Sequence, residues 1–164
     1  GDGPISPNRS GYVPLLPIIK MCFSGKYTLD DMKAKVSKTG GLLGLVGTDN
    51  MLEIKDRIAN GDQWAELIYR AFAYNLAKYI GSYACVLEGK VDGIVMTGGV
   101  SNDKDFIENV RKYAGWIAEL IVLAGDFEME ALANGAIRAL DDEEALLEYT
   151  GKPVWSGFDF EPED

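Results

Sequence analysis

The residues best suited to bind a ligand are two adjacent glycines that follow a short apolar run. The run Gly93–Thr97 has the composition of a buried strand, and Gly98 and Gly99 come directly after it. Glycine has no side chain to keep a flat ligand away from the backbone, and it tolerates positive φ angles. Ser101 or Asn102 can then cap the next helix, whose free N–H groups favour an anion. A nucleotide lying across this strand-to-helix turn fits the pattern, and so does a plain Gly-Gly turn of an α/β domain.

Arg9 is a second candidate because it stands alone in a loop-forming segment. Residues 1–17 are rich in Gly, Pro and Ser, which predicts little regular structure. On a loop stiffened by proline, an arginine could bind a phosphate or a carboxylate through two parallel hydrogen bonds. A solvated surface arginine is the alternative, and the residues alone leave both open.

Two acids, Glu128 and Glu130, are candidates for a metal site. They occupy the opening turn of a helix expected after the apolar run 119–124. Acids in a first helical turn ordinarily stabilise the helix dipole. They could also face a cleft and hold Mg²⁺, usually through water, with the ion bound to ATP phosphates.

The composition argues against several classes of function. The net charge of −10 with no basic run argues against a nucleic-acid partner. The absence of histidine excludes His-based triads, His general bases and zinc sites. No apolar stretch reaches the roughly 18–20 residues that span a bilayer, and none resembles a signal peptide. Cys22 and Cys85 lie on apolar helical patterns, so we expect buried, reduced thiols in a cytoplasmic protein.

Hydrophobic periodicity and capping residues predict an α/β order of elements. The order favours two parallel neighbouring strands, with the longest helix as a central core element whose aromatic residues serve packing. Asp49 or Asn50 is expected to cap one helix, and Thr28 another. Helices are expected over 15–23, 28–37, 51–59, 62–87 and 103–114 and again after 125, with strands over 93–97 and 119–124.

The segment Thr39–Thr48 is rich in glycine but is not a phosphate loop. It contains neither Gly-Lys-Ser/Thr nor a GxGxxG pattern after a strand. We expect Gly44 and Gly47 to let an apolar segment pack closely or approach a ligand ring. The acidic tail 141–164 carries Trp155 and Phe158 as expected docking points, and we assign it no chemistry.

Six stretches, in order and sensibly spaced, resemble the C-terminal half of the butyrate kinases. These belong to the acetate and butyrate kinase family, within the superfamily of sugar kinases, heat-shock proteins and actin. The resemblance implies an α/β fold: a ribonuclease H-like (actin-like ATPase) C-terminal domain, with helices packed on a short, incomplete sheet. The six stretches are 2–11, 22–28, 40–48, 77–81, 91–99 and 128–136.

The family reaction is the reversible transfer of the γ-phosphoryl group of ATP to butyrate or a similar short-chain carboxylate, giving an acyl phosphate and ADP. The resemblance implies ATP or ADP and Mg²⁺ as cofactors. It assigns Arg9 to charge stabilisation on the transferring phosphoryl group, and Glu128, with Glu130 as the second choice, to the magnesium. The positions implied for the adenosine are Gly98, Gly99, Val100 and Asn102, with Gly44, Gly47 and Asn50 in a loop over the adenine.

Two departures from the family pattern matter. Where relatives often carry an arginine after the Gly-Thr pair, this sequence has Asn50-Met51-Leu52, which puts a cation contact to the nucleotide there in doubt. The phosphate loops and the remaining catalytic residues of the family lie upstream of residue 1. The chain also begins Gly-Asp-Gly rather than Met. We therefore expect residues 1–164 to be the C-terminal nucleotide-binding portion of a two-domain kinase, inactive alone.

These expectations extend to partners. A bare parallel strand pair would expose an unpaired edge and an apolar face. We therefore expect this chain to be stable only with its upstream half or through self-association. The resemblance also implies a homo-oligomer in the intact enzyme. The alternatives are a non-catalytic, nucleotide-dependent binding module on the same scaffold and a structural subunit without a ligand.

Overall fold

The computed structural model describes residues 3–125, 127–141 and 149–151. The chain divides into two compact units, Gly1–Asp126 and Phe127–Asp164, and each is described by itself. The expected docking residues Trp155 and Phe158 lie outside the described residues. In the part of the chain that is described, no helix is long and apolar enough to cross a membrane.

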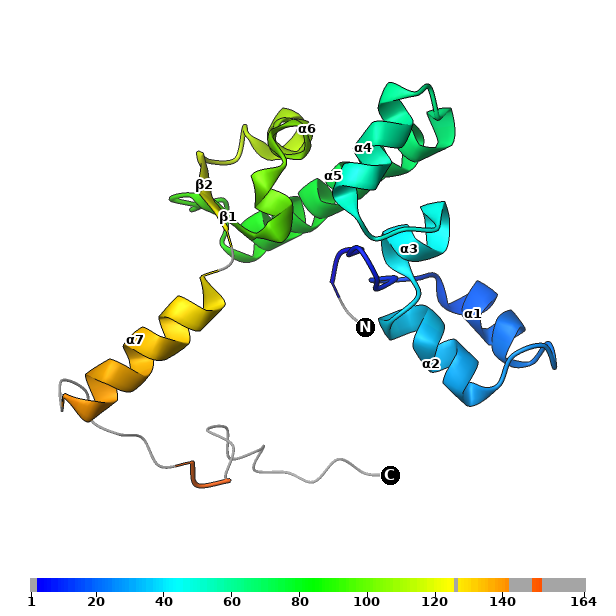
Figure 1. Ribbon diagram of the computed structural model, residues 1–164, viewed down its shortest axis with the longest axis horizontal. Helices are drawn as coiled ribbons and strands as arrows, with labels where there is room; N and C mark the ends of the chain where they lie inside the picture. Colours follow the sequence, from blue (N-terminus) through cyan, green and yellow to red (C-terminus); the bar gives the residue numbers. More distant parts are fainter. Residues whose placement is uncertain (1–2, 126, 142–148, 152–164) are drawn as a thin grey trace. The chain divides into compact units, whose positions relative to one another are not determined.

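The first unit is built on one long helix, α5 (Gln63–Val86) (Figure 1). Asp62 caps it by accepting a hydrogen bond of 3.0 Å from the N–H of Ala65. Its buried residues recur three and four positions apart, the spacing that places side chains on one helix face. They are Ala65, Ile68, Tyr69, Phe72, Ala73 and Ala77.

The helix α6 (Lys104–Ala114) packs on this face and closes the core. Phe106 is fully buried, with its ring centroid 4.7 Å from that of Phe72 and 6.0 Å from that of Tyr69. An aromatic cluster of this kind buries a large apolar area and favours tilted or edge-on ring geometry. The prediction that the aromatics of the long helix serve packing is therefore confirmed for Phe72, whereas Trp64 and Tyr83 are 52% and 62% exposed.

Four shorter helices precede α5. The first two are α1 (Leu15–Cys22), which has no buried residue, and α2 (Leu29–Ser37). A capping box opens α2, because the Thr28 side chain accepts from the N–H of Asp31, whose carboxylate accepts in return from the N–H of Thr28. The others are α3 (Gly41–Val46) and α4 (Met51–Ala59), and Asn50 is the cap of α4.

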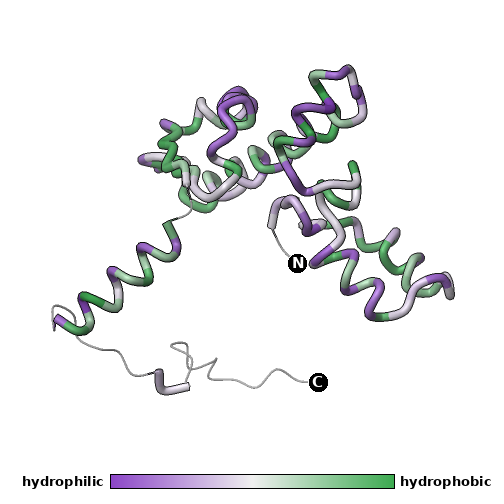
Figure 2. The backbone as a smooth tube through the Cα atoms, viewed as in Figure 1, coloured by the Kyte–Doolittle hydropathy of each residue, from purple (hydrophilic) through white to green (hydrophobic). Residues whose placement is uncertain are grey.

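Two strands form a parallel pair, as predicted. β1 (Ile94–Gly98) and β2 (Leu120–Ala124) pair in register from Ile94 opposite Leu120 to Gly98 opposite Ala124. The 3₁₀ turn η1 (Gly99–Asn102) follows β1 directly. Figure 2 shows both strands as mostly hydrophobic, yet Val95 is 56% and Leu123 53% exposed. The fold is thus mixed α/β, mostly helical, with a small sheet that leaves apolar side chains uncovered in the described part.

The described part of the second unit contains the helix α7 (Glu128–Leu140). Glu128 and Glu130 lie in its first turn, as predicted. The helix has no buried residue among those described.

Two predictions about local structure are wrong, and one helix was not predicted. Neither Ser101 nor Asn102 caps α6, because η1 takes up these residues and Asp103 becomes the cap. Cys22 and Cys85 are free but exposed, since neither lies on a helix face that meets the core. The segment 41–46, expected only as a glycine-rich stretch, is the helix α3.

Contacts at both ends hold α3 in place. At its start, the N–H groups of Gly40, Leu42 and Leu43 donate to the carbonyls of Asn8, Ser6 and Pro7 at 3.1, 3.3 and 2.9 Å. At its end, Arg57 Nη1 donates to the Val46 carbonyl at 2.6 Å and Trp64 Nε1 to the Leu45 carbonyl at 2.9 Å. Backbone groups that a six-residue helix leaves unpaired are thereby satisfied.

The same contacts fix the loop that carries Arg9. Gly41 has a φ of +60°, and a Cβ there would overlap the Ser6 carbonyl oxygen and lie 2.8 Å from the Arg9 carbonyl oxygen. Only glycine allows this approach. The Ile5 N–H also donates to Asn75 Oδ1 on α5 at 2.9 Å. The Arg9 loop is therefore seated on α3 and tied to α5.

Gly41→Ala should displace this loop and destabilise the protein more than Gly47→Ala does. Both glycines have positive φ, +60° and +82°, where alanine costs roughly 1–2 kcal/mol. Gly47 faces open space, whereas a Cβ on Gly41 meets backbone, which adds about 1–3 kcal/mol. Urea unfolding of the two variants measures the difference, and equal losses would contradict this account.

Candidate functional site

The predicted glycine turn is held by its own side chains and leaves its backbone open. Gly98 has a φ of +80°, and a Cβ at Gly98 or Gly99 would meet nothing within 4 Å. Ser101 Oγ donates to the Gly98 carbonyl at 2.6 Å, and Asn102 Nδ2 donates to the Gly99 carbonyl at 3.1 Å. A flat ligand could therefore reach this backbone without displacing a side chain.

A groove of about 600 Å³ runs beside the turn. One wall is the start of α4, and the other is η1 with the start of α6. We call it the η1 groove. Three of the residues predicted to bind a nucleotide lie along it, although what they bind stays a prediction. Its lining residues are Met51, Leu52, Lys55, Gly99, Val100, Asn102, Asp103, Lys104 and Asp105.

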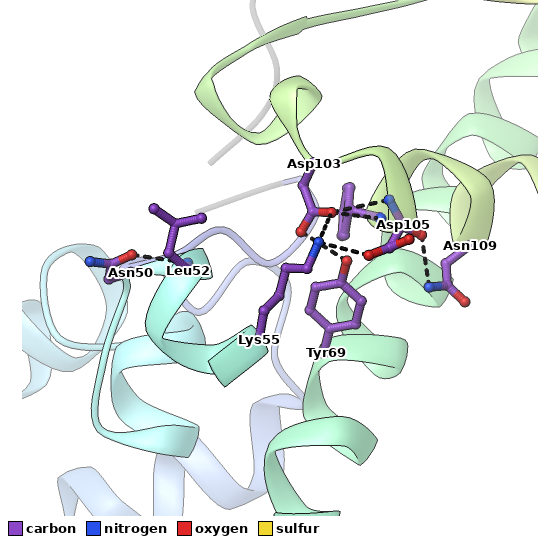
Figure 3. Close-up of polar contacts among 8 residues, drawn as sticks. Asn50, Leu52, Lys55, Tyr69, Asp103, Asp105 and Asn109 are labelled. Carbon is purple, nitrogen blue, oxygen red and sulfur yellow. Dashed lines mark hydrogen bonds and ion pairs between the residues drawn. The ribbon is translucent and has the colours of Figure 1, made fainter. Parts of the chain in front are cut away.

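A polar network lies at the groove and joins α4, α5 and α6 (Figure 3). Lys55 Nζ lies 3.0 Å from Asp103 Oδ1 and 2.7 Å from Asp105 Oδ2. The Tyr69 hydroxyl donates to the other Asp103 oxygen, Oδ2, at 2.9 Å. Asp103 Oδ1 also accepts from the N–H groups of Asp105 and Phe106 at 3.1 and 3.3 Å. One carboxylate therefore binds side chains of two helices and the first turn of a third.

The electrostatics favour a charged pair with a neutral tyrosine. The Asp103 side chain is 9% exposed. Burial tends to raise its pKa, but hydrogen bonds from Lys55, Tyr69 and the Phe106 N–H outweigh this and lower the pKa. Hydrogen bonds to Asp105 and Asp103 raise the pKa of Lys55. Burial, and then the hydrogen bond to Asp103, raise the pKa of Tyr69.

This arrangement changes the chemistry expected of the turn. The sequence predicted free N–H groups at the start of the next helix, ready for an anion. Asp103 is itself the anion there, because its carboxylate already accepts two of those hydrogen bonds. The η1 groove therefore offers backbone groups, apolar side chains and a neutralised acid, which suit the uncharged part of a ligand better than its phosphates.

The other residues predicted around the adenine lie in or beside α3 and α4. Asn50 Oδ1 accepts from the Leu52 N–H at 3.0 Å, so this side chain serves the cap of α4 next to the groove wall. Gly44 lies inside α3, where a Cβ would be 2.8 Å from the Thr39 carbonyl oxygen. Of the two roles predicted for Gly44, close packing is the one its surroundings favour. Gly47 ends α3 and faces open space.

Neither Arg9 nor the two acids are among the residues that line this groove. Arg9 is exposed, is not among the lining residues, and is held through its backbone N–H, which donates to Ser6 Oγ at 3.0 Å. Glu128 and Glu130 belong to the second unit and are exposed. Within the described ranges, no group of three or more His, Cys, Asp or Glu could hold a metal ion. The roles of Arg9, Glu128 and Glu130 stay predictions.

Sequence reasoning missed Lys55, Tyr69 and Asp103 as members of one site. Lys55 is 48 residues from Asp103 and Tyr69 is 34 residues from it, so no local spacing connects them. One signal was available: aspartate is as good a helix cap as serine or asparagine. It would have made Asp103 a third candidate cap, but it would have identified neither of its partners.

Asp103→Asn should reduce stability at pH 7 by about 1–3 kcal/mol, the usual worth of hydrogen bonds to a charged group. The folded-state pKa of Asp103 lies below its unfolded value of about 4. Its stabilisation is therefore present above pH 4 and is lost as the pH falls through the folded-state pKa. Urea unfolding between about pH 3 and pH 7 should show the gap from wild type closing in acid.

The charge-matched control is Asp92→Asn, at an exposed loop position. It should change stability by less than about 0.5 kcal/mol at pH 7. A stability difference between wild type and Asp103→Asn that stays constant with pH would show that the charge of the carboxylate is not its source.

Solved structures of similar proteins match most of this chain. Acetate kinase from Porphyromonas gingivalis matches with a TM-score of 0.72 at 23% identity, over 83% of this chain and 41% of that one. Propionate kinase from Francisella tularensis subsp. tularensis SCHU S4 gives 0.66 at 23% identity, over 78% and 39%. Acetate kinase from Entamoeba histolytica gives 0.69 at 17% identity, over 82% and 43%.

These matches identify the fold as the actin-like fold of such kinases. The chain spans about two fifths of the length of each structure. The model of the Acetokinase family matches residues 2–142 of this sequence. Since that match takes in nearly all of the described residues, the chain belongs to the Acetokinase family.

Proposed function

We propose that this chain is the adenosine-binding portion of a carboxylate kinase. The reaction is the reversible transfer of the γ-phosphoryl group of ATP to a short-chain carboxylate. The observation that carries the proposal is the open backbone of Gly98 and Gly99 at the edge of the η1 groove. Membership of the Acetokinase family supports the same reaction. Val100 and Asn102 line the groove and would contact the nucleoside.

Phosphoryl transfer needs positioned groups and charge neutralisation more than covalent help from the protein. We assign the neutralising role to Arg9, whose fork of donors fits phosphoryl oxygens. Its loop is held by backbone hydrogen bonds to α3, which would limit its movement. Asn50, Gly44 and Gly47 stay predicted neighbours of the adenine.

A magnesium ion would be held at Glu128. Mg²⁺ is commonly bound by one or two carboxylates together with substrate phosphates and water, so a single exposed carboxylate fits it. The bound ion would neutralise charge on the ATP phosphates. Glu130 is the second choice, two residues along the same first turn.

The rest of the intact enzyme is proposed to supply the phosphate side of the site and most of the acid-binding pocket. The matched structures are more than twice as long as the part that this chain covers. We further propose butyrate as the acid, from the butyrate-kinase-like stretches of the sequence. A homo-oligomeric enzyme and a cytoplasmic location stay predictions from that resemblance.

The intact protein should form acyl phosphate from ATP, Mg²⁺ and a carboxylate, with activity peaking at a four-carbon acid. Trapping the product as a hydroxamate, over a panel of two- to six-carbon acids, measures this. Residues 1–164 alone should show no turnover, because half of the proposed site lies elsewhere. Clear ATP binding without activity on any acid would instead favour a nucleotide-dependent binding module.

Arg9→Ala in the intact protein should lower kcat by about 100-fold or more while changing the KM for ATP little. A contact made mainly in the transition state affects kcat in this way, and loss of one such donor has this scale. Arg9→Lys keeps the charge without the fork and should recover only part of the rate. An effect confined to the KM for ATP would demote Arg9 to ground-state binding.

A further inference from the structure

One side chain, Lys55, connects the two walls of the η1 groove directly. In the described part of the chain, α4 and α6 each pack on α5 but make few contacts with one another. Lys55 on α4 crosses the gap and pairs with Asp103 and Asp105 at the start of α6. Lys55 also lines the groove. The distance across the groove therefore depends on this lysine more than on direct contact between α4 and α6.

Tyr69 orients the carboxylate that Lys55 binds. Its hydroxyl donates to Asp103 Oδ2 at 2.9 Å and leaves Oδ1 facing Lys55 and the N–H groups of α6. Tyr69 is 5% exposed and its ring lies against Phe106 in the core, so its position is fixed by packing. Tyr69 of α5 thus fixes the position of the Asp103 carboxylate, and this carboxylate in turn fixes the position of the Lys55 ammonium group.

Asp103 also lies directly after the turn that forms the opposite wall. Its N–H donates to the Val100 carbonyl at 3.1 Å, which closes the 3₁₀ turn of η1. A shift of Asp103 would therefore move Val100 and Asn102 relative to Met51 and Leu52. The network connects both walls of the groove to a single acid.

We propose that Lys55 is a positioning residue that sets the width of the η1 groove for a nucleoside, acting through Asp103 and Tyr69. This inference rests on the proposed function, since it assumes that a nucleoside binds in the groove. Lys55 does not serve as a phosphate ligand, because two carboxylates within 3.0 Å already neutralise its charge. Its removal lets the walls move apart, which weakens binding of the neutral nucleoside itself.

The test compares Lys55→Met with Lys112→Met by calorimetric titration of the intact protein with adenosine and with ADP. Lys112 is an exposed lysine of α6 that does not line the η1 groove, so its loss removes the same charge from outside the proposed site. Lys55→Met should weaken adenosine and ADP binding by a similar factor of about ten, the lower end of the loss that removing a partner of a metal ligand causes. Lys112→Met should leave the binding of both ligands unchanged.

Tyr69→Phe provides a second, independent variant. It removes one hydroxyl and keeps the ring in the core, so the fold should persist, which a thermal melt verifies. Because Tyr69 and Lys55 act through the same carboxylate, the double variant should lose less affinity than the two single losses together. Fully additive losses would contradict a shared route through Asp103.

Loss of ADP affinity with adenosine binding unchanged in Lys55→Met would show that Lys55 contacts phosphate, and would overturn the inference. Unchanged affinity for both ligands would overturn it as well, with the network left as a stabilising contact only. A wild-type protein that binds neither ligand would instead contradict the proposed function, and the inference with it.

Discussion

Burial of one face of α5 is the constraint on which the rest of the first unit depends. That face supplies the apolar contacts for α3, α4 and α6. Polar side chains near this face then fix the positions of the segments that the apolar contacts only bring close together. Asn75 binds the Arg9 loop, Asp62 pairs with Arg57 at 2.6 Å, and Tyr69 holds Asp103. Apolar burial is non-directional, so these polar contacts are what specify the relative positions of the loops.

The elements that the sequence predicts well are those whose signals are local. Helix α4 begins at an asparagine cap and α5 at an aspartate cap, and both show apolar residues three and four apart. The strands were recognisable as short apolar runs between polar turns. In contrast, α3 has two glycines in six residues, a composition that disfavours a helix. It forms because the Arg9 loop, Arg57 and Trp64 satisfy its ends, and these partners are distant in sequence.

The candidate site likewise has one part that local residue types predict and one part that they do not. The open Gly98–Gly99 turn follows from residue types alone, because glycine has no side chain to cover the backbone. The chemistry of the next helix start does not follow, since it depends on whether Asp103 or an earlier residue becomes the cap. The 3₁₀ turn decides this by using residues 99–102, and it turns a predicted anion site into one already filled by a carboxylate.

Under the proposed function an acidic chain must bind ATP, and the charges at the groove reduce the electrostatic repulsion that this entails. The net charge of −10 repels a nucleotide at long range, although salt screens this beyond about 8 Å at physiological ionic strength. At the groove, Lys55 pairs with Asp103 and Asp105 and offsets one of their two negative charges, so the local field is weaker than the acid count implies. A nucleoside held by backbone and apolar contacts needs no cation there. The phosphates would then be met by cations on other segments, of which Arg9 is the one we propose from this chain. Under the proposed function, different segments of the chain therefore carry out nucleoside recognition and charge neutralisation.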